Sequence, residues 1–118
     1  MGYIFVKAIL EGVNRQEEIE LLVDTGATLS TIPEDLAQRL EVPRLKPKRA
    51  QLADGRELVV EAGTVQIKIN GREAPTTVLI MGMGNEPLLG VETLETLGLK
   101  VNPQTRTLEP TRSFVLRL

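Results

Sequence analysis

The dipeptide Asn70-Gly71 constrains the fold of this chain more than any other feature. Asn-Gly pairs between alternating apolar and polar residues are the strongest short-range signal for a β-hairpin, because both turn positions take a positive φ. In the preceding segment, TVQIKI (64–69), every second residue is apolar, which predicts a strand with one buried face. An apolar run, TTVLIM (76–81), follows the turn. The middle of the chain is therefore expected to form adjacent antiparallel strands.

The rest of the sequence also divides into short elements. Asp54-Gly55 is a second turn signal and predicts a hairpin over residues 46–63. Two segments have helical features instead, because one begins at Pro33 and the other stops at Gly98. Further strands are expected at 3–10, 19–23, 99–102 and 105–110, and helices at 33–40 and 91–97. The pattern predicts an all-β fold, mainly β with one or two short helices.

The composition agrees with a single domain over residues 1–118. Of the 118 residues, 42% are hydrophobic and 25% are charged, which is the balance of an ordinary globular domain. The net charge of −2, with acids and bases interspersed, lacks the basic stripe that nucleic acid requires. No apolar run is long enough to span a membrane. The absence of cysteine excludes thiol chemistry and fits a reducing compartment, so a cytoplasmic location is expected.

Asp24 stands out in LLVDTGATLS (21–30), where a carboxylate directly follows a run of apolar residues. The chain has no histidine, so acid–base chemistry near neutral pH must come from carboxylates, lysine or tyrosine. The tripeptide Asp-Thr-Gly also has a purely structural explanation, because aspartate and glycine are common turn residues. On the tripeptide alone, both interpretations stay open.

A second motif favours the catalytic interpretation. DTGA (24–27) is followed further along the chain by LLG (88–90), at the start of the second expected helix. Together with the order of strands and hairpins, these motifs resemble the retropepsin-like aspartic peptidases, which are the retroviral proteases and their single-lobe cellular and prokaryotic relatives. The resemblance covers residues 1–102 and leaves 103–118 as a C-terminal extension. It implies a closed β-barrel of the acid protease fold, with one lobe per chain.

The resemblance implies an aspartic endopeptidase that works as a homodimer on extended peptides or proteins, without a cofactor or metal. A two-fold axis would bring two copies of Asp24 together. The two carboxyl groups would share one proton, because like charges about 3 Å apart cannot both ionise. One would act as base on a water molecule while the other polarises the scissile carbonyl.

The resemblance also gives roles to the neighbours of Asp24. Thr25 would hydrogen-bond across the dimer axis, and the amide of Gly26 would approach the carboxylates. Pepsin-type sites usually have a serine or threonine where this chain has Ala27, and that hydroxyl stabilises the ionised carboxylate. Because alanine has no such donor, activity is expected at mildly acidic to neutral pH.

Two further segments would complete the site. One would pack beside the Asp24 loop, where a glycine allows close approach of the backbone. The other is the hairpin 46–63, which would act as the flap that closes over a bound peptide. The residues concerned are Leu88, Leu89 and Gly90 beside the loop, and Ala53, Asp54 and Gly55 at the flap tip.

The sequence departs from the retroviral pattern in three places. Thr28 and Val91 stand where retroviral members usually have an aspartate and an arginine, so both ends of that ion pair are missing. Asp54 adds a negative charge at the flap tip, which would disfavour acidic substrate residues near it. The tail SFVLRL (113–118) alternates in character and is a candidate for a last strand, at the dimer interface or over an exposed edge.

Other interpretations fit the sequence less well. A catalytically weak or inactive dimer of the same fold could act as a peptide-binding module, but an unpaired carboxylate at its axis would cost desolvation and repulsion. Gly82-Met83-Gly84 lacks the third glycine of a nucleotide-binding loop, because position 87 is proline. The segment EEIE (17–20) has no spacing that closes a metal site. The peptidase is therefore the favoured function, with the binding module as the alternative.

Overall fold

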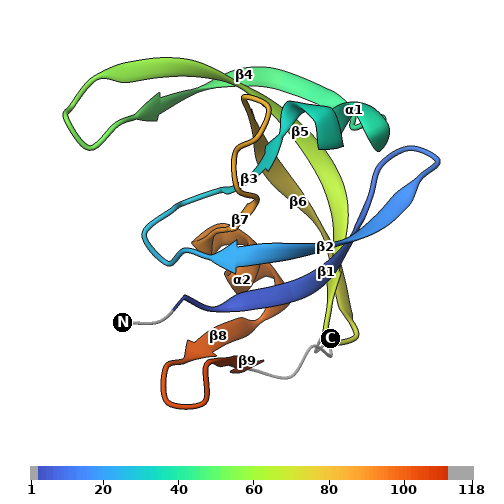
Figure 1. The fold of residues 1–118 in the computed structure, drawn as a ribbon, viewed down its shortest axis with the longest axis vertical. Coiled ribbons are helices and arrows are strands. Elements are labelled where there is room, and N and C mark those ends of the chain that lie inside the picture. Colours follow the sequence, from blue (N-terminus) through green and yellow to red (C-terminus); the bar gives the residue numbers. More distant parts are fainter. Residues whose placement is uncertain (1–2, 112–118) are drawn as a thin grey trace, which may run out of the picture.

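In the computed structural model, which describes residues 3–111, strands make up most of the chain and two short helices pack against them (Figure 1). The strands are β1 (Phe5–Glu11), β2 (Gln16–Val23), β3 (Ser30–Pro33), β4 (Arg44–Gln51), β5 (Glu57–Ile69), β6 (Arg72–Met81), β7 (Leu88–Leu89), β8 (Leu99–Asn102) and β9 (Thr107–Pro110). The helices are α1 (Glu34–Arg39) and α2 (Val91–Leu97). The all-β prediction is confirmed.

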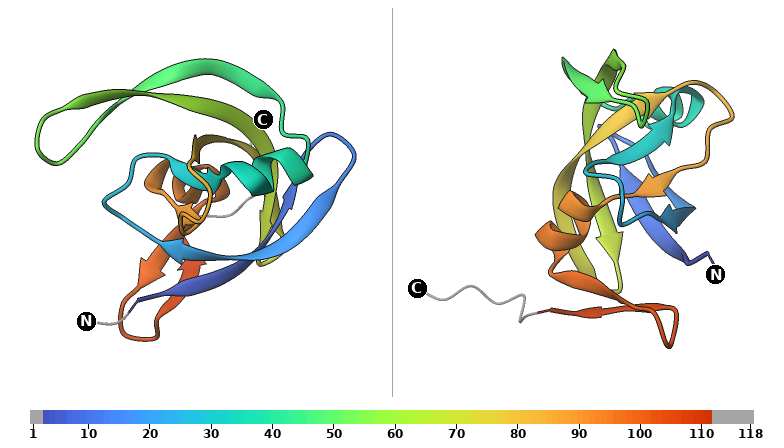
Figure 2. Two further views of the ribbon diagram at one scale, coloured as in Figure 1. Left: turned by 45° about the horizontal axis from the view of Figure 1, so that its top comes forward. Right: turned by 90° about the vertical axis from the view of Figure 1, so that its left-hand side faces the viewer.

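The larger sheet closes on itself. Its strands follow the order β1-β2-β7-β3-β6-β5-β4, and β1 also pairs with β5, so that six strands form a ring around the core. β4 lies outside this ring and, within the described part of the chain, pairs only with β5. The β4–β5 hairpin and the β8–β9 hairpin lie at opposite ends of the molecule (Figure 2).

The hairpin at Asn70-Gly71 forms as predicted. Both turn residues have a positive φ, 52° and 78°, and Ile69 pairs directly with Arg72 across the turn. The alternating apolar side chains of β5 (Val65, Ile67 and Ile69) are all buried, and they contribute to the single cluster of buried hydrophobic residues in the described chain. The alternation therefore identified the buried face of this strand correctly.

The strands differ from the prediction in several places, among them the start of β2 at Gln16 and the short strand β7, which was not predicted. β5 is one continuous strand of 13 residues, in which the second half of the predicted hairpin 46–63 and the 64–69 segment join without a break. β6 begins at Arg72, earlier than the apolar run, since pairing starts at the turn itself. The short strand β3 was not predicted. It pairs in parallel with β6, and a four-residue strand followed at once by a helix has little local signal.

Both helices lie close to where they were expected. In α1, Leu36 and Ala37 are buried, and Pro33 is the N-cap residue rather than the first helical position. In α2, Leu94 and Leu97 are buried. Gly98 ends this helix in the left-handed conformation, as predicted.

The start of the C-terminal extension packs onto the rest of the chain. β8 and β9 form the expected antiparallel hairpin, and Leu108 reaches the hydrophobic core. The N–H of Thr111 donates to the carbonyl of Gly98. The predicted strand at 113–118 lies outside the described residues. Within residues 3–111, no helix is long and apolar enough to cross a membrane.

Three buried hydroxyl groups connect α2 to two strands of the ring. The Thr93 hydroxyl, which is fully buried, lies 2.6 Å from the Ser30 hydroxyl and 2.8 Å from that of Thr76. Ser30 in turn accepts a hydrogen bond from the N–H of Gly90 at 2.9 Å. A buried hydroxyl group destabilises the fold unless it has a hydrogen-bond partner. Thr93, at the centre of this cluster, provides a partner for the hydroxyl groups of both Ser30 and Thr76.

Replacing Thr93 with valine should therefore destabilise the fold. The Thr93→Val variant keeps the shape of the side chain but leaves the hydroxyls of Ser30 and Thr76 without their shared partner. We expect the free energy of unfolding to fall by about 1–3 kcal/mol. Urea denaturation followed by circular dichroism measures this change.

Thr96→Val is the matched control on the same helix. The Thr96 hydroxyl is exposed and bonds only to the carbonyl of Glu92 within its own helix. This variant should change the stability by no more than about 0.5 kcal/mol. Equal effects of the two substitutions would show that the buried hydroxyl cluster has no special role.

Candidate active site

Asp24 begins the loop that follows β2, and the neighbouring strand β7 fixes its position. Val23 pairs in parallel with Leu89. The N–H of Asp24 then donates to the carbonyl of Leu89 at 2.9 Å. The segment LLG, predicted to pack beside this loop, thus lies directly against it. Leu89 is fully buried, whereas Leu88 is half-buried and pairs with both β2 and β3.

The loop is a compact turn around the half-buried Asp24 side chain. The N–H of Gly26 donates to Asp24 Oδ1 at 2.9 Å, and the N–H of Ala27 donates to the Asp24 carbonyl at 3.1 Å. A Cβ atom at Gly26 would lie 3.2 Å from Oδ1, so a side chain would crowd the carboxylate. Thr25 is exposed at the outside of the turn. The contacts that form this Asx turn therefore also orient the carboxylate of Asp24.

Helix α2 anchors the far side of this loop. The N–H of Val91 donates to the carbonyl of Ala27, and the N–H of Glu92 donates to that of Thr28, both at 2.9 Å. These bonds satisfy two of the N–H groups that the first turn of any helix leaves without an intrahelical partner. Thr28 thus meets the start of α2 through the backbone, with no ion pair between side chains.

Gly90 allows this arrangement because its backbone lies directly against the segment that follows the Asp24 loop. A Cβ atom at Gly90 would lie 2.6 Å from the carbonyl carbon of Leu29 and 2.9 Å from the nitrogen of Ser30. Real Cβ atoms do not approach backbone so closely, so only glycine fits here. The requirement for Gly90 is steric.

The β4–β5 hairpin projects from the ring over the Asp24 loop (Figure 1). Its turn is closed by a hydrogen bond from the N–H of Leu52 to the carbonyl of Arg56 at 2.7 Å. The predicted tip residues Ala53, Asp54 and Gly55 are all exposed. The Asp54 carboxylate accepts two hydrogen bonds from Arg56, one from its N–H at 3.0 Å and one from Nε at 2.7 Å. The negative charge at the tip is thus paired within the turn.

An ion-pair cluster lies at the base of this hairpin. Arg44 contacts Glu34 on α1 at 2.6 Å and Glu61 on β5 at 3.3 Å. The hydrogen bond from Arg44 lowers the pKa of Glu34, and the same bond raises the pKa of Arg44. The stabilisation from Glu34 is present above its unfolded pKa and is lost as the pH falls through the lowered folded value. This ion pair at the hairpin base is therefore lost in acid.

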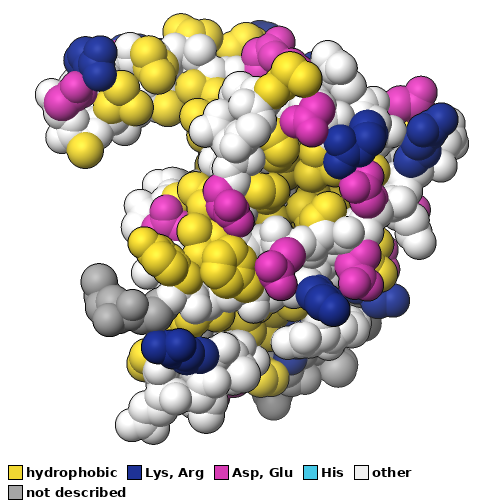
Figure 3. Space-filling view, viewed as in Figure 1, with side chains coloured by type: hydrophobic (Ala, Val, Ile, Leu, Met, Phe, Trp, Pro, Cys, Tyr) yellow, Lys and Arg dark blue, Asp and Glu magenta, His cyan; other side chains and the backbone are white. Residues whose placement is uncertain are grey.

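A cleft of about 540 Å³ lies between the Asp24 loop and β4. Figure 3 shows the molecule hollowed beneath the projecting hairpin, with hydrophobic side chains in the hollow. The lining comes from two groups of residues, one around the loop (Gly26, Ala27, Thr28, Leu29, Thr31 and Leu79) and one on β4 (Lys48, Arg49, Ala50 and Gln51). The sequence interpretation expected the hairpin to contribute its tip, whereas the lining comes from the C-terminal half of β4. The charge-rich sequence of β4 gave no periodic signal for this placement.

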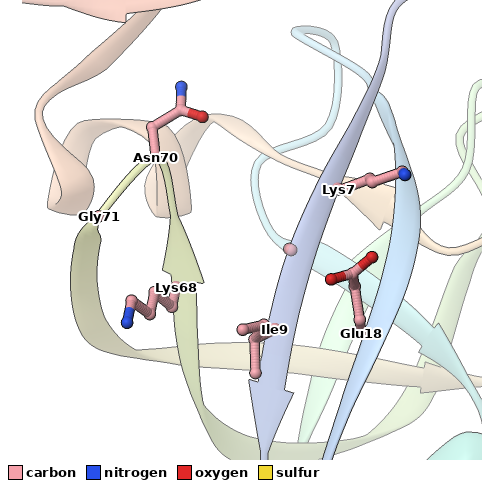
Figure 4. A pocket seen from close by; sticks show the side chains of 7 residues that line it. Lys7, Ile9, Glu18, Lys68, Asn70 and Gly71 are labelled. Atoms are coloured by element: carbon pink, nitrogen blue, oxygen red, sulfur yellow. The ribbon is translucent and has the colours of Figure 1, made fainter.

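A second, smaller pocket of about 180 Å³ lies over β1, β2 and the β5–β6 turn. Its charged side chains are Lys7, Glu18 and Lys68, and in Figure 4 Ile9 lies between Glu18 and Lys68. No convergent set of reactive groups forms there. Within residues 3–111, no three acidic side chains are close enough together to hold a metal ion.

Comparisons with known proteins agree with this geometry. The family model described as "gag-polyprotein putative aspartyl protease" matches residues 11–96. Among solved structures, the chain is similar to the EIAV protease in complex with the inhibitor HBY-793, with a TM-score of 0.69 and 21% sequence identity over 86% of this chain and 93% of that one. No curated protein matches the sequence significantly.

The family model spans well over half of the chain and includes the Asp24 loop, the hairpin and α2. The structural similarity independently supports the retroviral protease fold. The resemblance seen in the motifs DTGA and LLG is thus confirmed at the level of the family. The chain belongs to the retropepsin-like family of gag-polyprotein aspartyl proteases.

Proposed function

We propose that this protein is an aspartic endopeptidase that acts as a homodimer on extended peptides. The observation that carries the proposal is the placement of Asp24. Its carboxylate is oriented by the Gly26 amide in a loop held by β7 and α2, and the following residues line the cleft beneath the hairpin. In a chain of the aspartyl protease family, such a carboxylate is the natural catalytic group.

The contents of the cleft support the need for two chains. Residues 26–29, which follow Asp24 in its loop, line the cleft, and no aspartate or glutamate lines it within residues 3–111, so Asp24 is the one carboxyl group that a single chain would bring to the reaction. A two-fold axis beside the loop would supply the second copy. The exposed Thr25, at the outside of the turn, is the residue we expect to hydrogen-bond across that axis.

Peptide hydrolysis then needs only the two carboxyl groups and water. The pair shares one proton, which belongs to the pair and to neither residue alone. The ionised carboxylate takes a proton from the water molecule while the water oxygen bonds to the carbonyl carbon of the peptide. The protonated carboxyl group of the pair donates a hydrogen bond to the carbonyl oxygen. Return of a proton to the amide nitrogen lets the C–N bond break, giving a carboxylic acid and an amine.

The hairpin would hold the substrate by its backbone. β4 is the terminal strand of the larger sheet, and one of its edges has no strand beside it within the described residues. An extended peptide in the cleft could add to this edge as a further strand, which gives affinity with little dependence on sequence. The predicted tip residues Ala53, Asp54 and Gly55 would then move with the hairpin as it opens and closes.

One prediction of this function concerns Asp24 itself. Asp24→Asn keeps the size of the side chain but removes the base, so cleavage of a denatured protein should fall by about 10²–10⁴-fold. Asp35→Asn is the control, because Asp35 lies on α1 and pairs with Arg39 away from the cleft. Wild-type rates of cleavage by Asp24→Asn would contradict the catalytic role of Asp24, whereas no cleavage by the wild type itself would leave the binding module as the better function.

A mixing experiment tests whether the site needs two chains. When wild-type chains are re-equilibrated with an excess of Asp24→Asn chains, most wild-type chains enter mixed dimers that contain one carboxyl group. Activity per wild-type chain should then fall nearly to zero. If activity stays constant at every mixing ratio, each chain works alone and the shared site is wrong.

A further prediction concerns the pH dependence. Ala27→Ser adds a hydroxyl beside the Asp24 loop that can donate to the ionised carboxylate and stabilise it. The acidic limb of the pH–rate profile should move to lower pH by about one unit. Ala27→Val is the control for added bulk without a donor. A serine variant that gains no activity at the acidic end would show that this position does not tune the site.

A further inference from the structure

The charged side chains that line the cleft all have the same sign. Among the residues that line it, the charged side chains are Lys48 and Arg49, and both are positive. Arg49 is already paired with Glu57 on the facing strand. Within residues 3–111, no carboxylate forms an ion pair with Lys48. The cleft lining therefore carries one positive charge, that of Lys48, which no carboxylate within residues 3–111 compensates.

The positive charge of Lys48 differs from those of the arginine residues in the same hairpin. Residues 44–63 contain five basic and three acidic side chains, a net charge of +2 in a chain whose total is −2. The three arginines each bind a carboxylate: Arg44 binds Glu34 and Glu61, Arg49 binds Glu57, and Arg56 binds Asp54. The positive excess thus resides on Lys46 and Lys48, and of these two only Lys48 lines the cleft.

We infer that Lys48 gives the cleft a preference for peptides that carry aspartate or glutamate close to the cleaved bond. The inference rests on the proposed function, because it assumes that the peptide lies in this cleft. A peptide paired with the edge of β4 passes directly beside Lys48, so an acidic side chain at the matching position meets its ammonium group. In a two-fold dimer each hairpin supplies one such lysine, and the preference applies on both sides of the bond.

This inference reverses the expectation drawn from Asp54. The sequence suggested that a carboxylate at the hairpin tip would repel acidic substrates. In the structure, Asp54 is bound by Arg56 and is absent from the cleft lining. The charge that faces the substrate path is that of Lys48.

Pairs of peptides test the inference. A cleavage site is first mapped in a denatured protein, and peptides around it are made with Glu or Gln at each nearby position in turn. At one or more positions the wild type should cleave the Glu peptide about two- to fivefold faster in kcat/KM, as expected for a partly exposed ion pair. The difference should shrink at high ionic strength.

Charge reversal supplies the matched variants. Lys48→Glu should make the Gln peptide the better substrate, whereas Lys46→Glu, with the same change of net charge on the same strand, should keep the wild-type preference. Equal cleavage of Glu and Gln peptides by the wild type would overturn the inference. So would a preference that Lys48→Glu leaves unchanged.

A binding measurement separates this inference from the proposed function. The Asp24→Asn variant should bind labelled Glu peptides more tightly than Gln peptides in fluorescence anisotropy, with no cleavage required. Tighter binding of Glu peptides, with no cleavage by the wild type, would support the role of Lys48 while contradicting the peptidase. Equal binding, with cleavage intact, would overturn the role of Lys48 alone.

Discussion

The close approach of Gly90 to the backbone of Leu29 is the constraint on which the site depends. Because no side chain intervenes, β7 can lie between β2 and β3, and the N–H groups in the first turn of α2 can donate to the carbonyls of the Asp24 loop. The loop that carries the carboxylate is thereby held by β7 and α2. The Thr93 hydroxyl cluster strengthens the same junction from the core side.

Local patterns in the sequence were sufficient to predict much of this architecture. Turn dipeptides located the β4–β5 and β5–β6 hairpins, alternating apolar residues located the buried face of β5, and glycine located the end of α2. Each of these signals depends on neighbouring residues alone. The family was identified from two short motifs, DTGA and LLG. Only the resemblance to known proteases predicted that these two motifs lie side by side in the fold.

The parts that were missed depend on contacts between distant segments. β3 exists because β6 and β7 lie on its two sides, and Ser30 is buried because Gly90 and Thr93 meet it there. Likewise, nothing in the sequence of β4 indicates that Lys48 faces the cleft while Lys46 does not. The pairing of β4 with β5 also has a register irregularity between Leu45 and Lys48, which the sequence of β4 alone does not indicate.

The closure of the larger sheet has a consequence for the behaviour of the protein at high concentration. A ring of strands offers no free backbone edge to a neighbouring molecule, and in this sheet only β4 lies outside the ring. Unprotected edges promote polymerisation, and proteins commonly guard them with lysine, arginine and proline. β4, with the sequence RLKPKRAQ, contains all three. The lysine, arginine and proline residues that guard against pairing of one copy with the next thus lie on the same edge to which a bound peptide would add as a strand.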